Sequence, residues 1–273
     1  MSKEQSGTGQ VFQGYARFYD QLYATKSYDA EVAFVLDRVA AHGHTVPRRL
    51  LDLGCGTGGH MLPLLQRGIE VSGVDRSEEM TAQAREKLTA APQGQSWKVS
   101  CRDIRDFRDG SKYDVVVSMF AVMGYLTSND DFLRGLDTAR AHLDTGGLFI
   151  FDVWHGSAVL HELPETRIHQ YPAGQGETLK LVTPVLDCMM NVVTVNYRIL
   201  TLEAETVKAD VRESHDMRYF FVPEIELLLQ QANFRMLEVC EFMHADRRPG
   251  ITTWNLAVVA EAIDNLKKEA GNG

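Results

Sequence analysis

The stretch LLDLGCGTGGH, residues 50–60, decides the fold of this chain. Its apolar first half is typical of a short buried strand, and its second half carries Gly54, Gly56 and Gly58. Glycines in such a turn allow unusual backbone angles and let a ligand approach the main chain closely. The stretch therefore predicts a strand, a ligand-binding turn and a helix, in that order.

Strands and helices alternate on both sides of this turn. Helical spacing of apolar residues predicts a helix over 28–41, and Ser77 is a typical N-cap for a helix over SEEMTAQAREKL. Between the helices lie the apolar segments IEVSGVD, WKVSCRD and YDVVVSMF, and LFIFDVW follows a turn predicted at DTGG. Such alternation indicates parallel strands joined by helical crossovers.

The alternation stops near residue 160. Residues 160–221 contain three segments rich in β-branched and aromatic residues with no helix between them, which indicates an antiparallel insertion. A helix over PEIELLLQQANF, with Pro223 in its first turn, and two more strands then complete the sheet. We therefore predict an α/β fold with a doubly wound, mostly parallel, seven-stranded Rossmann-like sheet. Residues 1–159 and 222–273 would form the ligand-binding domain, and residues 160–221 would cap its active site.

Composition excludes several classes of function. The chain has 37 acidic and 28 basic residues and a net charge of −9, which argues against a general nucleic-acid binder. Its four cysteines form no CxxC pair, so neither a zinc site nor a disulfide framework is predicted. The first ten residues lack the apolar core of a signal peptide, and no apolar run is long enough to span a membrane. We expect a cytoplasmic protein that binds a small molecule and no membrane.

Two acidic residues narrow the choice of ligand. Asp75 ends the strand after the glycine turn, where a carboxylate can accept both hydroxyls of a ribose. Asp52 lies within the first strand, just before the turn. A pyrophosphate would gain little from this second negative charge, whereas a cationic amino-acid ligand has no such conflict.

The pattern resembles the first motif of class I S-adenosylmethionine-dependent methyltransferases. CRDIRDF is similar to the adenine-binding motif of that family, which implies that Asp103 accepts from the adenine amino group and that Ile104 packs on the ring. Asp114 and the LDTGG turn also match the family pattern in order and spacing. The resemblance implies S-adenosylmethionine as cofactor and S-adenosylhomocysteine as product. The expected cofactor contacts are Tyr15, Tyr19, Asp52, Gly54, Gly56, Asp75, Arg76, Met80, Asp103, Ile104 and Met119.

Four further segments resemble bacterial methyltransferases of nucleotide-linked sugars, especially amino-sugar N,N-dimethyltransferases. They are YARFYDQLY, MFAVMGYL, FDVWHG and ESHDMRYFF. The likeness implies that the first segment forms a lid, with Tyr15 or Tyr19 touching the cofactor. It also implies a substrate site between the loops after the fourth and fifth strands and the insertion.

The chain departs from these N-methyltransferases at one position, because Tyr125 replaces the histidine that they carry after the fourth strand. A phenol with a pKa of about 10 is a poor base at neutral pH but a good positioning group. A neutral amine needs little more than positioning, whereas an alcohol must lose a proton and benefits from a base. His215 and His155 are the candidate bases, and the choice between nitrogen and oxygen stays open.

Three other residues are expected to contact the substrate. Trp154 follows the fifth strand, near the expected acceptor. Arg247 and Arg248 lie in a loop and are able to clasp a diphosphate, because guanidinium groups pair with phosphate oxygens in a bidentate way. No metal is required, since Asp152 alone is not the carboxylate cluster that a metal-dependent O-methyltransferase needs. The oligomeric state stays open, a homodimer included.

Three alternatives remain at this point. An oxidoreductase with a nicotinamide cofactor would also have a glycine turn, but GCGTGG lacks the usual final spacing and is preceded by Asp52. A non-catalytic protein that binds an adenosyl ligand would show affinity without methyl transfer. The third alternative is a methyltransferase of another small metabolite, such as an amine or a natural-product phenol.

Overall fold

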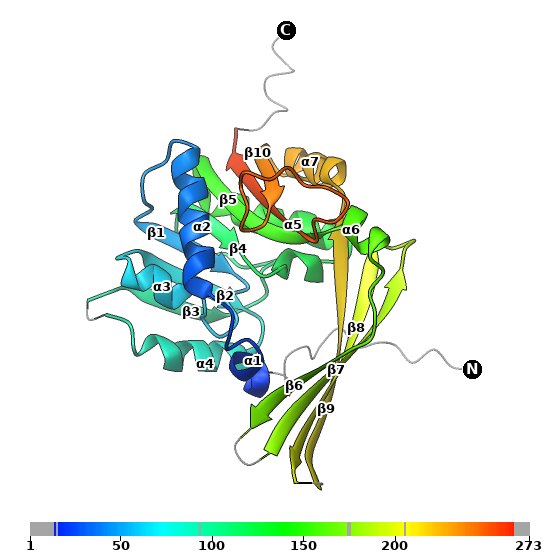
Figure 1. The fold of residues 1–273 in the computed structure, drawn as a ribbon. Helices are drawn as coiled ribbons and strands as arrows, with labels where there is room; N and C mark the ends of the chain where they lie inside the picture. Colours follow the sequence, from blue (N-terminus) through cyan, green and yellow to red (C-terminus); the bar gives the residue numbers. More distant parts are fainter. Residues whose placement is uncertain (1–13, 15, 93, 174–175, 205, 265–273) are drawn as a thin grey trace.

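The computed structural model describes residue 14 and residues 16–92, 94–173, 176–204 and 206–264. Figure 1 shows a parallel sheet with helices on both faces, from which a group of long antiparallel strands projects to one side. The described strands form one sheet of eleven strands. Four of these are the projecting strands, which leaves seven in the main body.

The seven strands of the main body lie in the order β3, β2, β1, β4, β5, β11, β10. The first five are parallel, and β11 runs antiparallel between β5 and β10. This confirms the predicted doubly wound, mostly parallel sheet. The strands are β1 (Arg49–Leu53), β2 (Glu70–Asp75), β3 (Trp97–Cys101), β4 (Tyr113–Ser118), β5 (Leu143–His155), β10 (Phe234–Glu241) and β11 (Asn255–Ala262).

Helices cover both faces of this sheet. Alternate residues of its strands point to opposite sides, and the apolar residues on each side pack with helices. Phe149 and Phe151 of β5 pack with one group of helices, α5 and α7, whereas Leu148 and Ile150 pack with α2 and α3. The helices are α1 (Ala16–Leu22), α2 (Tyr28–Ala41), α3 (Met61–Gln66), α4 (Glu78–Leu88), η1 (Val122–Tyr125), α5 (Asn129–Ala141), α6 (Gly156–His161) and α7 (Val222–Gln231).

The caps that the sequence indicates are present. The Ser77 hydroxyl accepts from the Met80 amide at 3.2 Å, which satisfies one of the free N–H groups at the start of α4. Pro223 lies in the first turn of α7, where its missing N–H costs nothing. Helix α2 has the predicted bounds, Tyr28–Ala41.

The predicted turn at DTGG is wrong, because these residues form a bulge within strand β5. Strand β5 begins at Leu143 and runs through these residues, which bulge out of the pairing with β4: Tyr113 pairs with Leu143, but Val115 already pairs with Leu148. Gly146, with a φ of +90°, adopts a conformation that residues with a Cβ rarely reach. The glycine pair therefore marks a bulge within a long strand.

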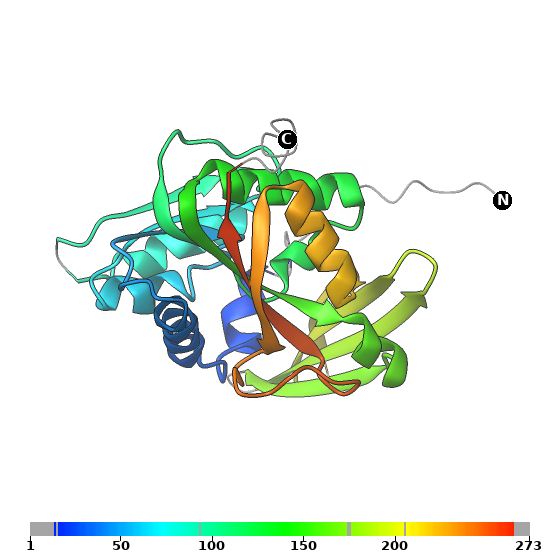
Figure 2. The ribbon, with the colours of Figure 1, turned by 90° about the horizontal axis from the view of Figure 1, so that it is seen from above.

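The antiparallel strands lie in the order β9, β8, β7, β6 and are joined to the main body through β5. Trp154 and His155 at the end of β5 pair in parallel with Tyr219 and Phe220 of β9. Figures 1 and 2 both show these strands beside the carboxyl end of β5. Their bounds are β6 (Arg167–Ala173), β7 (Gly176–Asp187), β8 (Val192–Glu203) and β9 (Thr206–Phe220).

The predicted antiparallel region is thus confirmed as part of the fold. Helix α6 spans Gly156–His161, so it begins just before the predicted insertion and was not expected from the sequence. The division into domains at residues 159 and 222 stays a prediction.

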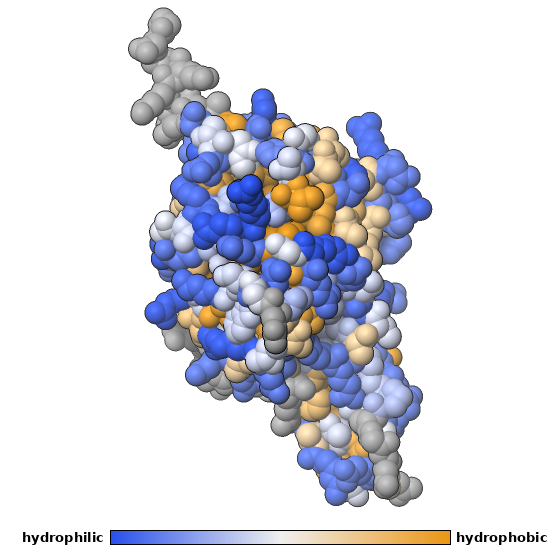
Figure 3. All heavy atoms as spheres, turned by 90° about the vertical axis from the view of Figure 1, so that its left-hand side faces the viewer, coloured by the Kyte–Doolittle hydropathy of each residue, from blue (hydrophilic) through white to orange (hydrophobic). Residues whose placement is uncertain are grey.

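The surface is mainly hydrophilic on the face shown in Figure 3, with small apolar patches between charged groups. In the part of the chain that the structure describes, no helix has the length and hydrophobicity needed to cross a bilayer. The cytoplasmic location stays a prediction.

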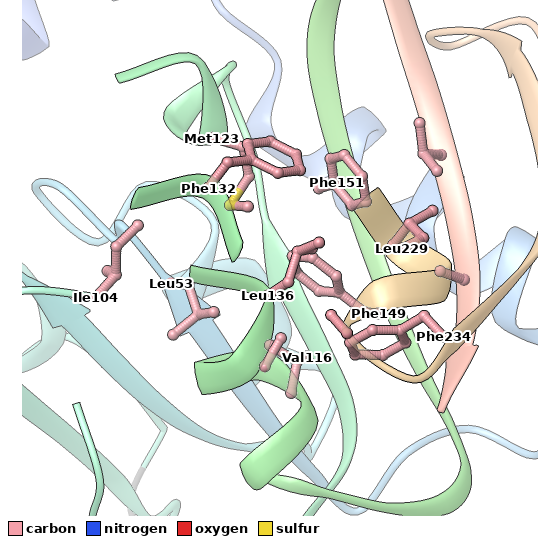
Figure 4. Packing of buried hydrophobic residues seen from close by; sticks show 14 of the residues in the cluster. Leu53, Ile104, Val116, Met123, Phe132, Leu136, Phe149, Phe151, Leu229 and Phe234 are labelled. Carbon is pink, nitrogen blue, oxygen red and sulfur yellow. The ribbon is translucent and has the colours of Figure 1, made fainter. Parts of the chain in front are cut away.

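Replacing Phe149 by Ala is expected to lower the free energy of unfolding by about 3–5 kcal/mol, because it leaves a cavity in the core. Phe149 is fully buried and stacks on Phe151 with ring centroids 4.8 Å apart, and Phe234 lies on its other side (Figure 4). Denaturant unfolding measures this loss. Leu227→Ala, at a side chain that is 56% exposed, is the control and should change stability by about 0.5 kcal/mol at most.

Candidate active site

One large cavity opens at the carboxyl ends of the parallel strands. Its walls come from the turn after β1, the end of β2, the loop after β3, the segment after β4 and the end of β5. Strands β8 and β9 and the region of α1 close it on the remaining sides. Ligands bind at this edge in open α/β sheets, so its position agrees with the predicted site.

The glycine turn is shaped by close approaches of the backbone. The amides of Gly54 and Cys55 donate to the Val74 carbonyl at 2.7 and 3.1 Å, which holds the turn against β2. Gly54 has a φ of +85°, and a Cβ there would lie 2.3 Å from a methyl carbon of Val122. Gly56 also has a positive φ, but the space beside it is open. A ligand can therefore reach the main chain at Gly56.

Asp75 lies at the end of β2 and faces the cavity. Its Oδ2 accepts from the Gly56 amide at 3.0 Å, and its Oδ1 accepts from the Ser77 amide at 2.9 Å. Burial raises the pKa of this carboxyl, while these backbone hydrogen bonds oppose the shift. Each oxygen keeps one further lone pair that can accept from a ligand hydroxyl. Arg76 and Met80 line the same wall.

Asp103 and Ile104 also line the cavity, in the loop after β3. The Arg105 guanidinium binds both oxygens of Asp103, from Nε to Oδ1 at 3.0 Å and from Nη2 to Oδ2 at 2.6 Å. Burial of Asp103 raises its pKa, but the hydrogen bonds from Arg105 outweigh this effect and lower it. The Arg105 amide also donates to Oδ1, so Oδ2 is the oxygen with acceptor capacity left for an adenine amino group.

Asp52 is buried beneath the turn and does not line the cavity. Its Oδ2 has no hydrogen-bond partner among the described residues. Burial raises the pKa of this carboxyl to about 6, and His60 nearby opposes the shift. A buried carboxylate without a full set of partners is costly, so a positive charge brought to this region would stabilise it.

The segment after β4 has a strained backbone that sequence analysis did not predict. Phe120 and Ala121 both have positive φ values, 71° and 55°. The Ala121 amide donates to both oxygens of Asp152 at 3.0 Å, and burial raises the pKa of Asp152 to about 6. Strain of this kind persists where surrounding contacts enforce it, often at functional sites. Asp152 thus holds the loop that carries Phe120 and Met119 into the cavity.

Tyr125 and His215 meet in the cavity wall that η1 and β9 form. The Tyr125 hydroxyl lies 3.1 Å from His215 Nδ1, and His215 Nε2 lies 3.0 Å from Glu213 Oε2. Burial raises the pKa of Tyr125 well above its usual value, so this phenol is neutral at physiological pH. Trp154 and Tyr197 line the same region. The structure thus brings together two catalytic candidates, Tyr125 and His215, and one substrate candidate, Trp154.

His60 lines the cavity as well and was not among the predicted site residues. It is buried, and its Nε2 lies 2.7 Å from Glu31 Oε2. Lys26 is bound to the other oxygen of Glu31, and the Tyr28 ring meets His60 edge-on at 5.0 Å. No local motif signals this group, because its members come from α2, the loop before it and the start of α3.

Besides Asp52, three predicted site residues lie outside the cavity lining. His155 does not line the cavity: its Nδ1 lies 3.2 Å from the Thr253 carbonyl, and burial lowers its pKa. Arg247 and Arg248 are exposed in the loop between β10 and β11, where Arg247 pairs with Glu241 at 3.2 Å. Of the two predicted lid tyrosines, Tyr19 lines the cavity and Tyr15 lies outside the described residues.

Comparisons with known proteins agree with this architecture. Residues 50–147 match a family model described as a methyltransferase domain. A dTDP-3-amino-3,4,6-trideoxy-alpha-D-glucopyranose N,N-dimethyltransferase of Streptomyces venezuelae is 33% identical over 142 residues, which cover 51% of this chain and 57% of that protein. A dTDP-4-amino-2,3,4,6-tetradeoxy-D-glucose N,N-dimethyltransferase of Saccharopolyspora spinosa is 26% identical over 229 residues, 81% of this chain and 85% of that protein.

A solved structure shares the fold over nearly the whole chain. It is an S-adenosylmethionine-dependent methyltransferase from Clostridium acetobutylicum, with a TM-score of 0.76 and 21% identity, and the match covers 93% of this chain and 100% of that one. The matched family region contains the glycine turn, Asp75 and the loop after β3, which together form one side of the cavity. Residues 50–147 are therefore a methyltransferase domain, and the chain has the fold of a solved S-adenosylmethionine-dependent methyltransferase.

Proposed function

We propose that this enzyme methylates the amino group of a small amino sugar. The observation that carries the proposal is a single cavity that joins the glycine turn, Asp75 and Asp103 to the Tyr125–His215 pair. Two relatives are named as N,N-dimethyltransferases of dTDP-linked amino sugars, which supports the choice of acceptor. Proximity and orientation in such a cavity are the main source of rate enhancement for a neutral amine.

The residues present fit S-adenosylmethionine. Asp75 would hold the ribose hydroxyls, Asp103 Oδ2 the adenine amino group and Ile104 the adenine ring. The open space at Gly56 would admit the amino-acid portion, whose ammonium would offset the buried charge of Asp52 with its unpartnered Oδ2. When bound, this cofactor supplies an electrophilic methyl group, whose bond to sulfur breaks as the lone pair of the acceptor forms the new bond to carbon.

The acceptor region is mainly aromatic. Tyr23, Phe120, Trp154 and Tyr197 provide ring faces on which the apolar side of a sugar can pack, and the Tyr125–His215 pair supplies polar atoms. The Tyr125 hydroxyl, held by His215, would orient the amine by hydrogen bonding, while the surrounding rings would exclude water.

The nucleotide-linked form of the sugar is the acceptor that we propose to test first. The arginines that line the cavity, Arg76 and Arg105, follow β2 and β3 beside the expected cofactor contacts, so the nucleotide would extend toward the mouth of the cavity. Arg247 and Arg248 would contribute only by leaving their exposed positions in the loop between β10 and β11.

Calorimetric titration with S-adenosylhomocysteine, with NADH and with a panel of free and nucleotide-linked amino sugars tests the proposal. We expect micromolar binding of S-adenosylhomocysteine, no binding of NADH, and binding of an amino sugar beside the bound product. Methylation of amines that are not sugars, with none of the sugars accepted, would overturn the proposed acceptor. The mass of the protein in solution decides between a monomer and a homodimer.

Asp75→Ala is expected to weaken S-adenosylhomocysteine binding by about 10- to 100-fold, because hydrogen bonds to a charged acceptor contribute about 1.5–3 kcal/mol. Calorimetry measures the change. Asp144→Ala, at an exposed carboxylate, is the control. Because Asp75 also holds two backbone amides, Asp75→Asn is measured alongside it, with thermal unfolding as a check of folding. Unchanged affinity in both variants would remove Asp75 from the ribose site.

Asp52→Asn is expected to stabilise the free protein increasingly as the pH rises from about 4 to about 7. The pKa of Asp52 is raised from 3.8 to about 6 on folding, so its ionisation costs stability above the lower value, and the full cost is reached above the higher one. Asparagine does not ionise. The gain is read as the difference in melting temperature between variant and wild type.

The same Asp52→Asn variant should bind S-adenosylhomocysteine more weakly, because the buried negative charge that favours the ammonium is gone. Asp144→Asn serves as the matched control at an exposed position. A difference in melting temperature that does not change with pH, together with unchanged affinity, would contradict the role given to Asp52.

His215→Asn is expected to reduce kcat by about 100-fold while leaving the affinity for S-adenosylhomocysteine nearly unchanged. The reason is that His215 contacts Tyr125 in the acceptor region and lies on β9, which carries none of the predicted cofactor contacts. Steady-state kinetics and calorimetry measure the two quantities. His169→Asn, at an exposed histidine of β6, is the control. Equal turnover in wild type and His215→Asn would remove His215 from the mechanism.

A further inference from the structure

We propose that Glu213 is a positioning residue that fixes the tautomer of His215 and makes the Tyr125 oxygen a hydrogen-bond acceptor toward the substrate. The enzyme would then select acceptors that carry an N–H group and would stop at the tertiary amine. This inference rests on the proposed function, because it specifies which amines the site methylates and how often.

The geometry comes from one strand. Glu213 and His215 are two residues apart on β9, so their side chains point to the same face. Both side chains are buried, with 8% and 2% of their surface exposed, and Glu213 Oε2 lies 3.0 Å from His215 Nε2. On the other side of the imidazole, Nδ1 lies 3.1 Å from the Tyr125 hydroxyl. The three groups form a continuous hydrogen-bonded chain that ends in the cavity.

A second contact holds the carboxylate in place. Glu213 Oε1 accepts from the Gly14 amide at 2.9 Å, so Gly14 lies against β9. A Cβ on Gly14 would lie 2.7 Å from a methyl carbon of Val211, which explains why this approach needs a glycine. Glu213 is thus fixed through both of its oxygens.

The direction of each hydrogen bond follows from the donors and acceptors. An ionised carboxylate can only accept, so His215 Nε2 must carry a hydrogen. In a neutral imidazole, Nδ1 then carries none and accepts the hydrogen of the Tyr125 hydroxyl. The hydrogen of Tyr125 is committed to His215, so its oxygen can only accept from a substrate group.

This polarity restricts the substrate. A primary or secondary amine can donate N–H to the Tyr125 oxygen, and this contact orients its lone pair. A neutral tertiary amine has no N–H and cannot make the contact, so a third methylation lacks the positioning that accelerates the first two. The Tyr125 oxygen thus requires an N–H donor on the substrate nitrogen. The shape of the cavity alone does not impose this restriction.

The same chain can carry away the proton that the reaction releases. After methyl transfer the acceptor is an ammonium, which can give an N–H proton to the Tyr125 oxygen while the Tyr125 hydrogen moves to His215 Nδ1. His215 then becomes an imidazolium beside the Glu213 carboxylate, which stabilises its charge. Loss of that proton to water restores the starting state, so the cycle balances.

The first test does not depend on turnover. In wild-type protein with ¹⁵N-labelled histidine, the NMR signals of His215, identified by their loss in His215→Asn, should show a protonated Nε2 and an unprotonated Nδ1. In Glu213→Gln, whose amide can donate to Nε2, the tautomer should reverse. A protonated Nδ1 in the neutral wild-type imidazole, or no change in Glu213→Gln, would overturn the proposal.

The second test follows the products. Glu213→Gln keeps the shape of the side chain, so we expect an unchanged affinity for S-adenosylhomocysteine and a fall in kcat of about tenfold or more on a primary amino sugar. Asp216→Asn is the matched control, because Asp216 points to the opposite face of β9 and bonds to Thr194. The wild type should convert the amine to the dimethylated product and leave that product unmethylated.

Different results would overturn the amino-sugar acceptor and the role of Glu213. A wild type that binds S-adenosylhomocysteine but methylates no amino sugar would overturn the proposed function, and the tautomer of His215 would still decide the role of Glu213. A wild type that dimethylates an amino sugar while Glu213→Gln matches it in kcat would overturn the role of Glu213 alone. Trimethylated product from the wild type would overturn the limit to tertiary amines.

Discussion

The pairing of two strands with β5 is the constraint on which the active site depends. Strand β11 pairs with β5 as far as Trp154. Strand β5 pairs with β4 as far as Phe151, and its last residues, Trp154 and His155, then pair with Tyr219 and Phe220 of β9. This short parallel contact joins the antiparallel strands to the main body at the edge where ligands bind. It places His215 and Tyr197 beside Tyr125, although Tyr125 and His215 are 90 residues apart in the sequence.

The site that results has two parts with different electrostatics. Around the glycine turn, Asp52, Asp75 and Asp103 are held by burial, backbone amides and Arg105, which suits a ligand with a ribose, an adenine and a positive charge. Around Tyr125 the walls are aromatic, and polarity comes from the hydrogen-bonded chain through His215 to Glu213. The strained segment at Phe120 and Ala121, fixed by Asp152, lies between them.

The expected cofactor contacts could be predicted from the sequence, because they lie at or just after the ends of successive strands. Gly54, Gly56, Asp75 and Ile104 follow strands within one alternating region, and the carboxyl ends of parallel strands always meet at one edge. Contacts between residues far apart in the sequence could not be predicted in this way. Glu213 and His60 were missed, because nothing near them in the chain marks their partners. His155 and the loop arginines were placed at the substrate, but the structure leaves them outside the cavity.

The sequence by itself determined the parallel sheet, the turn after its first strand, the bounds of α2 and the presence of antiparallel strands. Hydrophobic periodicity, caps and glycines act over a few residues, so their effects can be read locally. Only the tertiary structure decided that DTGG forms a bulge, that Asp152 holds a strained loop and that Glu213 reaches His215 and Gly14. These features depend on strand register and on the direction of buried hydrogen bonds, which no local pattern encodes.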